Sequence, residues 1–315
     1  MKGVTLQQLR VFTTVAKHLA FGKAADELCV TQPAVSMQIR ELERAVGLPL
    51  FDREGRRVSL TTPGEYFLVY ARRILATLKD AEDAMARMGG IEYGRLTVGL
   101  VSTAKYFLPR LIGQFLIEHP GIDLQLAVGN RKTLVEMIQR NEVDLAVMGR
   151  PPRELSTRVE PFAPHPSVII VSSDHPLNNH ERLSPAVLVN ERFIVREEGS
   201  GTRAAMEKFF RGHNLRPAYA MEISSNEAIK HAVAANLGIS FLSIHTLKLE
   251  LQAGMLKILD VEGMPVVGCW HVVHALSKTL SPAAEALRYY LIEHGERFLD
   301  SEFHDLYPSR MKASA

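Results

Sequence analysis

The chain is poor in cysteine: only Cys29 and Cys269 occur among its 315 residues. A disulfide-stapled secreted domain would contain many more, so the fold must depend on hydrophobic cores, for which 46% apolar residues are sufficient. Long apolar runs are also missing, since no stretch approaches the roughly twenty residues of a membrane-spanning helix. The N-terminus, MKGVTLQQLRVF, has no apolar signal core. We therefore expect a cytoplasmic protein without a membrane partner.

Signatures of a metal site or of an enzyme are missing as well. His165, His175 and His180 lack the compact spacing of zinc ligands. His271 and His274 alternate with valines, as strand residues do. The sequence has no G-x-S-x-G turn, no phosphate-binding G-x-x-x-x-G-K-[ST] loop and no H-E-x-x-H helix. These absences predict no metal, no cofactor and no catalytic residue.

Positive charge is scarce for a nucleic-acid-binding protein, because the formal net charge is only +2. The excess lies at one end: residues 1–88 contain 13 Lys and Arg against 10 Asp and Glu. This distribution permits a polyanionic partner such as DNA but does not require one.

The first sixty residues carry helical signals. Apolar residues recur at helical spacing from Leu6 to about His18, and a break is expected at Phe21-Gly22. A short second helix is predicted over 23–28, and a third over Gln32–Val46 with Pro33 in its first turn. Short helices, a tight turn and a third helix with a polar face predict a helix-turn-helix, whose third helix enters the DNA major groove.

The polar face of the third helix and the segment after it carry the candidate DNA contacts. Gln side chains can hydrogen-bond an adenine edge, and Ser can bond either base. The run LFDREGRRVSL predicts a small hairpin, or wing, that reaches phosphates or the minor groove, with a solvated charged turn as the alternative. The candidate DNA-binding residues are Thr31, Gln32, Pro33, Ser36, Gln38, Arg40, Arg53, Arg56 and Arg57.

The segment AFGKAADELCVTQPAVSMQIRELERAVGLPLFDREGRRVSLTTPGEYFL resembles the winged helix-turn-helix of LysR-type transcription regulators. The matching features are AA-x-x-L, TQPAVS-x-QI-x-x-LE, G-x-x-LF-x-R and L-T-x-x-G, and the resemblance extends along nearly the whole chain. It implies double-stranded DNA as a partner. Two positions depart from the pattern: Gly22 stands where the family usually has Ser or Thr, and Met37 where Arg or Lys is common. Each change removes an expected phosphate contact.

A long helix is predicted from Thr62 to Met88. Its apolar residues repeat every seven positions in two registers, which is typical of a two-stranded coiled coil. They are Phe67, Ile74, Ala81 and Met88 in one register and Ala71, Leu78 and Met85 in the other. We expect a homodimer formed through residues 63–90. The alternative is an amphipathic helix packed on its own domain.

Residues 91–303 alternate predicted strands and helices in two similar sets, which predicts an α/β domain with largely parallel sheets. The family resemblance implies two lobes like those of periplasmic solute-binding proteins. The expected fold is multidomain: an all-α winged helix-turn-helix over 1–62, a linker helix over 63–90, an effector domain with lobe one at 91–167 and 266–303 and lobe two at 168–265, and a tail over 304–315.

Three segments of this domain follow predicted strands, where open α/β sheets bind their ligands. Hydroxyl groups, cations and free N–H groups at helix starts suit an anion. The candidate effector-binding residues are Ser102, Thr103, Lys105, Met148, Gly149, Arg150, Gly201, Thr202 and Arg203. The alternatives are helix caps for Ser102 and Thr202 and a surface charge for Arg150; Arg131, Arg196 and Lys230 are placed less favourably.

The segments VGLVSTAKYFLP, VGNRKTLVEMI, VDLAVMGRPP and REEGSGTR resemble the CbbR branch of the family, whose members control Calvin-cycle carbon-fixation operons. This resemblance implies a phosphorylated sugar, phosphoenolpyruvate, a nucleotide or reduced nicotinamide phosphate as effector. It also implies a homotetramer, with RNA polymerase as a further candidate partner. Two alternatives stay open: a LysR-type regulator of another pathway with a non-phosphorylated effector, and an α/β enzyme fused to a DNA-binding domain. The operator and the choice between activator and repressor also stay open.

Overall fold

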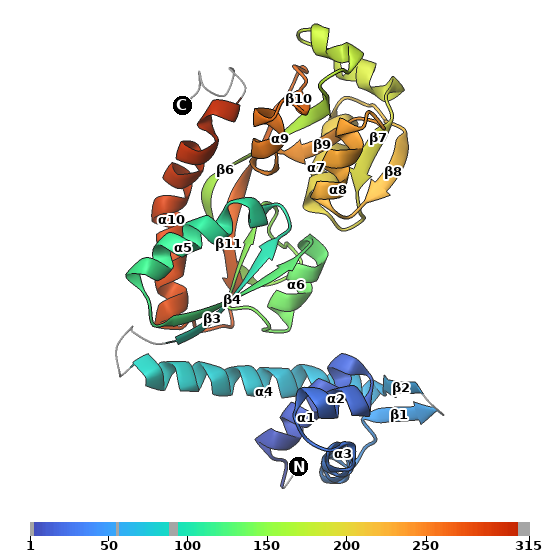
Figure 1. Cartoon of the computed structure of the whole chain (residues 1–315). Coiled ribbons are helices and arrows are strands. Elements are labelled where there is room, and N and C mark those ends of the chain that lie inside the picture. The colour runs from blue at the N-terminus through green and yellow to red at the C-terminus, as the bar shows by residue number, and fades with distance from the viewer. Residues whose placement is uncertain (1–2, 55–56, 88–93, 308–315) are drawn as a thin grey trace. The chain divides into compact units, whose positions relative to one another are not determined.

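The computed structural model describes residues 3–54, 57–87 and 94–307 (Figure 1). The chain divides into two compact units, residues 1–88 and 89–315, and each is described by itself. Within the described residues, no helix is both long and apolar enough to cross a membrane.

The N-terminal unit begins with α1 (Leu6–His18) and α2 (Phe21–Glu27). The Thr5 hydroxyl accepts a hydrogen bond from the backbone N–H of Gln8, whose side chain accepts one from the backbone N–H of Thr5, so the start of α1 is doubly capped. The expected break at Phe21-Gly22 is wrong, because both residues lie in the first turn of α2. The chain turns instead at Leu19, which adopts a left-handed conformation with φ of 47°.

The third helix, α3 (Gln32–Val46), has the expected bounds. Pro33 occupies its first turn, and Gly47 ends it with φ of 82°, a conformation that glycine adopts without strain. The antiparallel hairpin of β1 (Phe51–Glu54) and β2 (Arg57–Leu60) follows. The predicted helix-turn-helix and hairpin are thus both present, and residues 55 and 56 lie outside the described part of the chain.

The helix α4 (Thr62–Arg87) divides its apolar residues between two surfaces. Phe67 contacts Phe12 with ring centroids 5.3 Å apart, and Ala71 is fully buried in the same core. These two expected seam residues therefore pack on their own unit, as in the alternative interpretation. A second stripe of α4 is left uncovered in the single chain, because Tyr66, Val69, Tyr70 and Ile74 are 48 to 70% exposed. The expected seam residues Met85 and Met88 lie outside the side chains that the structure describes.

The second unit is built on a seven-stranded sheet with the order β10-β6-β11-β5-β3-β4 and with β9 paired to β6. Its strands are β3 (Gly94–Val101), β4 (Ile122–Gly129), β5 (Leu145–Met148), β6 (Thr157–Ser172), β9 (Ser240–Ser243), β10 (Leu256–Ile258) and β11 (Val266–Ala275). A smaller parallel sheet joins β7 (Phe193–Arg196) and β8 (Tyr219–Ile223). The expectation of largely parallel sheets is wrong for the large sheet, because β6 pairs antiparallel with β9, β10 and β11.

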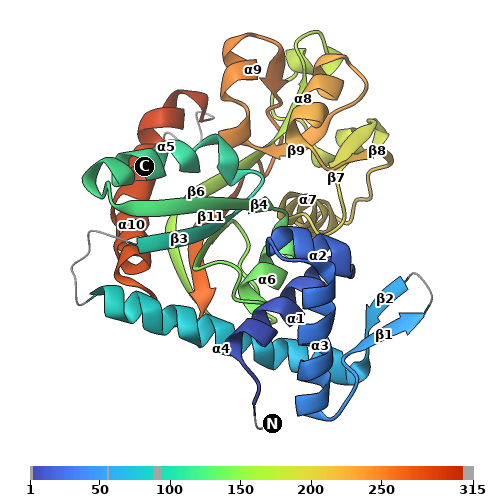
Figure 2. The same ribbon diagram turned by 60° about the horizontal axis from the view of Figure 1, so that its bottom comes forward.

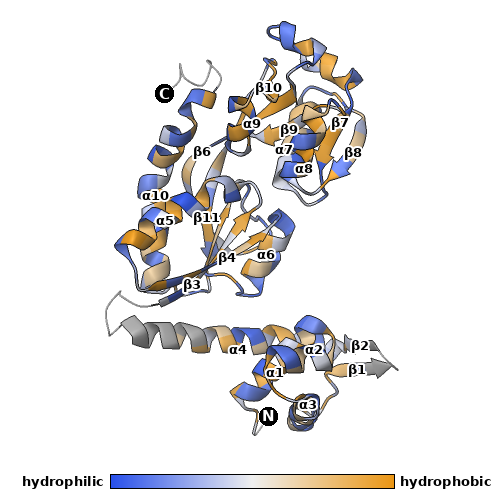
Figure 3. Ribbon diagram, in the orientation of Figure 1, coloured by the Kyte–Doolittle hydropathy of each residue, from blue (hydrophilic) through white to orange (hydrophobic). Residues whose placement is uncertain are grey.

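Two lobes arise because β6 and β11 run side by side from one hydrophobic core to another (Figures 1 and 2). Lobe one packs α5 (Leu108–Glu118), α6 (Arg131–Gln139) and α10 (Pro282–Phe303) around the strands β3, β4 and β5. Lobe two contains α7 (Gly201–Gly212), α8 (Asn226–Ala234) and α9 (Lys248–Gln252). In Figure 3 the strands of both lobes are mainly hydrophobic, which agrees with a hydrophobic core in each lobe.

The end of the described chain belongs to lobe one. The short helix η5 (His304–Leu306) continues from α10, and Leu306 and Tyr307 pack against the core of lobe one. Residues 304–307, which the sequence assigned to a tail, therefore pack with lobe one.

Candidate DNA-binding and effector-binding sites

The outer face of α3 carries the predicted base-reading residues. Val35, Ile39 and Leu42 are fully buried against the N-terminal core. The candidate residues all lie off this stripe: Thr31, Gln32, Pro33 and Arg40 are exposed, and Ser36 and Gln38 are half-buried. Met37 is 53% exposed. Because α3 is anchored on one face, its amide, hydroxyl and guanidinium groups lie away from the core, as the predicted base contacts require.

The wing arginines are described only through the backbone. Arg53 lies on β1 opposite Val58, and Arg57 lies on β2 opposite Glu54. Arg56 and the side chains of Arg53 and Arg57 lie outside what the structure describes. Their contacts with DNA remain predictions of the sequence.

A cavity of about 760 Å³, here called the interlobe cavity, lies between lobe one and lobe two. Six of the nine predicted effector residues line it: Ser102, Thr103, Gly149, Arg150, Gly201 and Thr202. These residues come from the ends of β3 and β5 and the start of α7, so the expected strand and helix ends do meet.

Three predicted residues do not line this cavity. Met148 is fully buried in the core of lobe one. The Lys105 ammonium is directed to Glu227, with 4.0 Å between Nζ and Oε1. Arg203 donates to Glu207 on the next turn of its helix at 3.0 Å and also pairs with Glu222. A residue next to one that lines the cavity can therefore face elsewhere, because successive side chains of a helix or strand point in different directions.

The charged residues in the described lining of the interlobe cavity are all cations. Five of the lining residues are Arg131, Arg150, Arg153, Arg196 and Lys208, and no Asp or Glu is among the described lining residues. Sequence reasoning ranked Arg131 and Arg196 too low and missed Arg153 and Lys208. A helical period could have revealed Lys208, because Gly201, Ala204, Ala205, Lys208 and Gly212 all face the cavity from α7.

Two of these cations are already compensated. Arg196 is only 3% exposed and holds Glu197 through an Nε–Oε2 contact of 2.8 Å. Arg131 pairs with Glu154 at 3.1 Å, and this hydrogen-bonded guanidinium lowers the pKa of that carboxyl to about 2.

Arg150, Arg153 and Lys208 differ from these two, because each lines the cavity without a carboxylate partner among the residues that the structure describes. Three positive charges therefore remain for a ligand. They lie on both lobes, since Lys208 belongs to α7 and the two arginines follow β5.

Two hydrogen bonds join the lobes beside the cavity. The Arg196 Nη2 donates to the Ser102 hydroxyl at 3.1 Å. The Asn130 Nδ2 donates to Glu197 Oε1 at 3.3 Å. Ser102 therefore contacts the opposite lobe. The alternative in which Ser102 and Thr202 cap helices is wrong, because Thr103 and Ser200 occupy the N-cap positions.

His165 closes the floor of the interlobe cavity. Its ring stacks on Trp270 with 3.9 Å between centroids, and burial lowers the pKa of the imidazole to about 3, so the ring is neutral. Among the described atoms, its Nε2 has no hydrogen-bond partner. A Cβ at Gly149 would lie 2.3 Å from the Nδ1 of His165, so glycine is required there for the close approach of this ring.

Two family models match the chain: that of the bacterial regulatory helix-turn-helix proteins of the lysR family over residues 6–65, and that of the LysR substrate-binding domain over residues 90–296. The HTH-type transcriptional regulator CfxR of Cupriavidus necator is 49% identical over 99% of both chains. The HTH-type transcriptional regulator CbbR of Rhodospirillum rubrum is 48% identical over 91% of this chain and 95% of its own.

Two solved structures also match the chain. The regulatory domain of Synechocystis CcmR in complex with 2-PG matches with a TM-score of 0.61 at 40% identity, covering 63% of this chain and 96% of that domain. A full-length OxyR variant of Pseudomonas aeruginosa matches with a TM-score of 0.72 over 93% of this chain and 95% of its own; at 23% identity it supports the fold alone. With both domain models matched and about half of all residues shared with a full-length relative, the chain belongs to the LysR family of transcription regulators.

Proposed function

We propose that this regulator binds DNA through α3 and the β1–β2 hairpin and controls carbon-fixation genes in response to a small phosphorylated metabolite held between its lobes. The names of its relatives support the target, because CfxR, CbbR and the RuBisCO operon transcriptional regulator of Allochromatium vinosum are 45 to 49% identical to this chain. The CcmR regulatory domain supports the ligand class, because it is in complex with 2-PG.

The observation that carries the ligand assignment is the set of three uncompensated cations, Arg150, Arg153 and Lys208, in a cavity whose described lining has no carboxylate. These three side chains are exposed, and a phosphate brings up to two negative charges and several acceptor oxygens that they can bind directly. A volume of about 760 Å³ is sufficient for a metabolite of this size.

The placement of these cations on both lobes suggests how the ligand acts. Arg150 belongs to lobe one and Lys208 to lobe two, so a single anion that contacts both favours one relative orientation of the lobes. The strands β6 and β11 are the connections about which that orientation changes. A tenfold effect on DNA binding needs a difference of only about 1.4 kcal/mol in the affinity of the ligand for two arrangements.

The same proposal assigns the remaining roles. Residues 1–62 bind DNA, 63–90 form the dimer helix, and the domain from 91 onwards senses the ligand. The exposed stripe of α4 supports a homodimer, and pairing of sensor domains would extend it to a tetramer. No residue is assigned a catalytic role.

The test is a calorimetric titration of the full chain with 2-phosphoglycolate. Lys208→Ala should weaken binding by at least about tenfold, the effect of removing one charge-assisted hydrogen bond. Arg211→Ala is the matched control, because Arg211 is an exposed cation on the same helix outside the cavity lining. Equal affinities for wild type and Lys208→Ala would contradict the assignment of this cavity.

A further inference from the structure

A carboxylate near the C-terminal end of α3 holds the first residues of the hairpin. The Oε1 atom of Glu43 accepts a hydrogen bond from the backbone N–H of Leu50 at 2.9 Å and another from that of Phe51 at 3.1 Å. Phe51 is the first residue of β1, and both Leu50 and Phe51 are buried. Because buried N–H groups require an acceptor, the position of this carboxylate determines where the hairpin leaves the helical core.

The carbonyl group of Leu50 is held from the other side, by the start of α4. It accepts a hydrogen bond from the backbone N–H of Thr61 at 3.1 Å. The Thr61 hydroxyl donates to the carbonyl of Pro49 at 2.7 Å and accepts from the backbone N–H of Gly64 at 3.0 Å. A Cβ at Gly64 would clash with the carbonyl oxygen of Leu50, so α4 can pass this close only at a glycine. We call Glu43, Leu50, Thr61 and Gly64 the Leu50 joint.

The Leu50 joint connects three elements with separate tasks. The helix α3 carries the predicted base contacts, the hairpin carries the predicted wing arginines, and α4 carries the exposed stripe proposed for the dimer; all three meet at the base of the hairpin (Figures 1 and 2). Both ends of the hairpin are tied down, one to α3 and the other to α4. A hairpin that is already held in place before DNA arrives loses less conformational freedom on binding.

We propose that Glu43 is a positioning residue for DNA binding. Through the Leu50 joint it holds the hairpin where its arginines reach the phosphates or the minor groove while α3 occupies the major groove. This inference rests on the proposed role of the hairpin in DNA binding.

Charge alone predicts the opposite effect for the loss of Glu43. Removal of a carboxylate near a polyanion should strengthen the binding of DNA. If Glu43 instead positions the hairpin, Glu43→Ala should weaken binding, because the hairpin no longer has a fixed place relative to α3.

A double-mutant cycle with Arg57 separates positioning from stability. Fluorescence anisotropy of the full chain, with a labelled duplex selected from a random library by the wild type, gives each Kd. In the wild type, Arg57→Ala should weaken binding about tenfold and reduce the slope of log Kd against log salt by about one. In Glu43→Ala the same change should weaken binding by less than about threefold. Partial unfolding would lower the fraction of chains that bind, but it would leave the effect of Arg57→Ala on Kd unchanged.

Two further variants accompany this cycle. Glu41→Ala is the matched control, because Glu41 is an exposed carboxylate on the same helix and contacts Gln8 of α1, not the hairpin, with 3.4 Å between its Oε2 and the Gln8 Nε2. It should leave the tenfold effect of Arg57→Ala in place. Thr61→Val removes both hydrogen bonds of the Thr61 hydroxyl with little change in shape. It should reduce the effect of Arg57→Ala in the same way as Glu43→Ala, and it decides the test if circular dichroism shows that Glu43→Ala does not fold.

The inference is overturned if Arg57→Ala weakens Glu43→Ala, or its substitute Thr61→Val, by the full factor seen in the wild type. It is also overturned if Glu41→Ala reduces that factor equally, because the effect would then come from charge. An Arg57→Ala chain that binds as tightly as the wild type would overturn the proposed DNA contact of the hairpin and this inference with it. Equal losses in both backgrounds would overturn the inference alone.

Discussion

At the scale of single residues, His165 makes the stability of the sensor unit depend on pH. The pKa of its imidazole is lowered to about 3 by burial. Between that value and the ordinary value near about 6.5, the unfolded chain binds a proton that the folded chain does not. Stability is therefore complete above about pH 7 and is lost as the pH falls, by roughly 2 kcal/mol at about pH 5 for this one group.

His165→Phe should make that dependence shallower. Phenylalanine keeps an aromatic ring on Trp270 and removes both the titration and the unpartnered nitrogen. Urea unfolding followed at pH 7 and pH 5 should then show a loss of stability smaller by about 2 kcal/mol. His180→Phe is the control, because His180 is exposed. If wild type and His165→Phe lost the same unfolding free energy between pH 7 and pH 5, His165 would be protonated in the folded protein.

Gly149 is a second position where one atom decides the packing. An added Cβ would meet the ring of His165 at 2.3 Å, so Gly149→Ala must displace that ring from Trp270. We expect a loss of about 1 to 3 kcal/mol in unfolding free energy, as for other overpacked cores, together with a shift in Trp270 emission. Gly113→Ala, in α5, meets nothing within 4 Å and should be slightly stabilising. A neutral Gly149→Ala would mean that His165 has room to move.

At the scale of elements, α3 should separate base reading from phosphate binding. Gln32 stands at its exposed N-terminal end, whereas Arg40 is an exposed cation about two turns further along the same helix. Gln32→Ala should cost about 1 to 3 kcal/mol on a DNA site selected from a random library by the wild type and little on unrelated DNA. Arg40→Ala should weaken binding to the selected site and to unrelated DNA by similar factors. It should also reduce the salt dependence of both affinities. Fluorescence anisotropy measures each affinity. If Gln32→Ala weakened binding to the selected site and to unrelated DNA by the same factor, Gln32 would not read a base.

The sequence predicts the helices whose bounds depend on neighbouring residues. It does not predict strands that form only by pairing with a distant part of the chain. The bounds of α1 and α3 follow from Thr5, Pro33 and Gly47, which act within one turn. The strand β6 was recognisable only as an extended, proline-rich segment, because proline cannot donate a hydrogen bond to a neighbouring strand. It forms a strand because β11, about a hundred residues later, pairs along it with a register shift at Trp270/His271.

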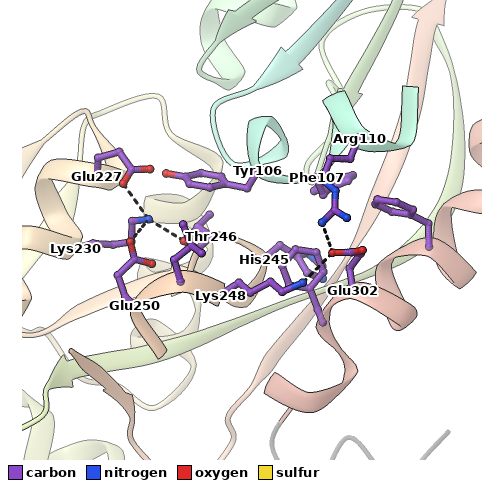
Figure 4. A pocket seen from close by; sticks show the side chains of 13 residues that line it. Tyr106, Phe107, Arg110, Glu227, Lys230, His245, Thr246, Lys248, Glu250 and Glu302 are labelled. Atoms are coloured by element: carbon purple, nitrogen blue, oxygen red, sulfur yellow. Dashed lines mark hydrogen bonds and ion pairs between the residues drawn. The ribbon is translucent and has the colours of Figure 1, made fainter. Parts of the chain in front are cut away.

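The residues that line the candidate effector site likewise include some that the sequence predicts and some that it does not. Ser102, Gly149 and Thr202 follow strands that were recognisable as such, and the structure brings all three to the interlobe cavity. Arg153 lies in a segment without helix or strand, whose direction depends on tertiary packing. Lys208 could have been found from the helical period of α7. The contacts of His245 with Phe107 (Figure 4) and Phe303 could not be predicted, because these rings meet only through the folding of three distant segments.

At the scale of the whole molecule, the division into residues 1–88 and 89–315 predicts that sensing survives without the DNA-binding unit. Both lobes, the interlobe cavity and Trp270 lie within residues 94–307. A fragment of residues 89–315 should bind 2-phosphoglycolate with the Kd of the full chain. At about one hundred times that Kd, the ligand should raise its unfolding free energy by about 2.7 kcal/mol.

In the full chain, the same ligand should raise only one of two unfolding transitions, the one that Trp270 emission reports. The transition of residues 1–88, followed by the loss of helical circular dichroism, should not move, because none of the described lining residues of the interlobe cavity belongs to this unit. Fragment 1–88 supplies the reference midpoint for that assignment. If the ligand stabilises both transitions equally, or if fragment 89–315 does not bind it, the two units form one cooperative structure and the ligand site requires both.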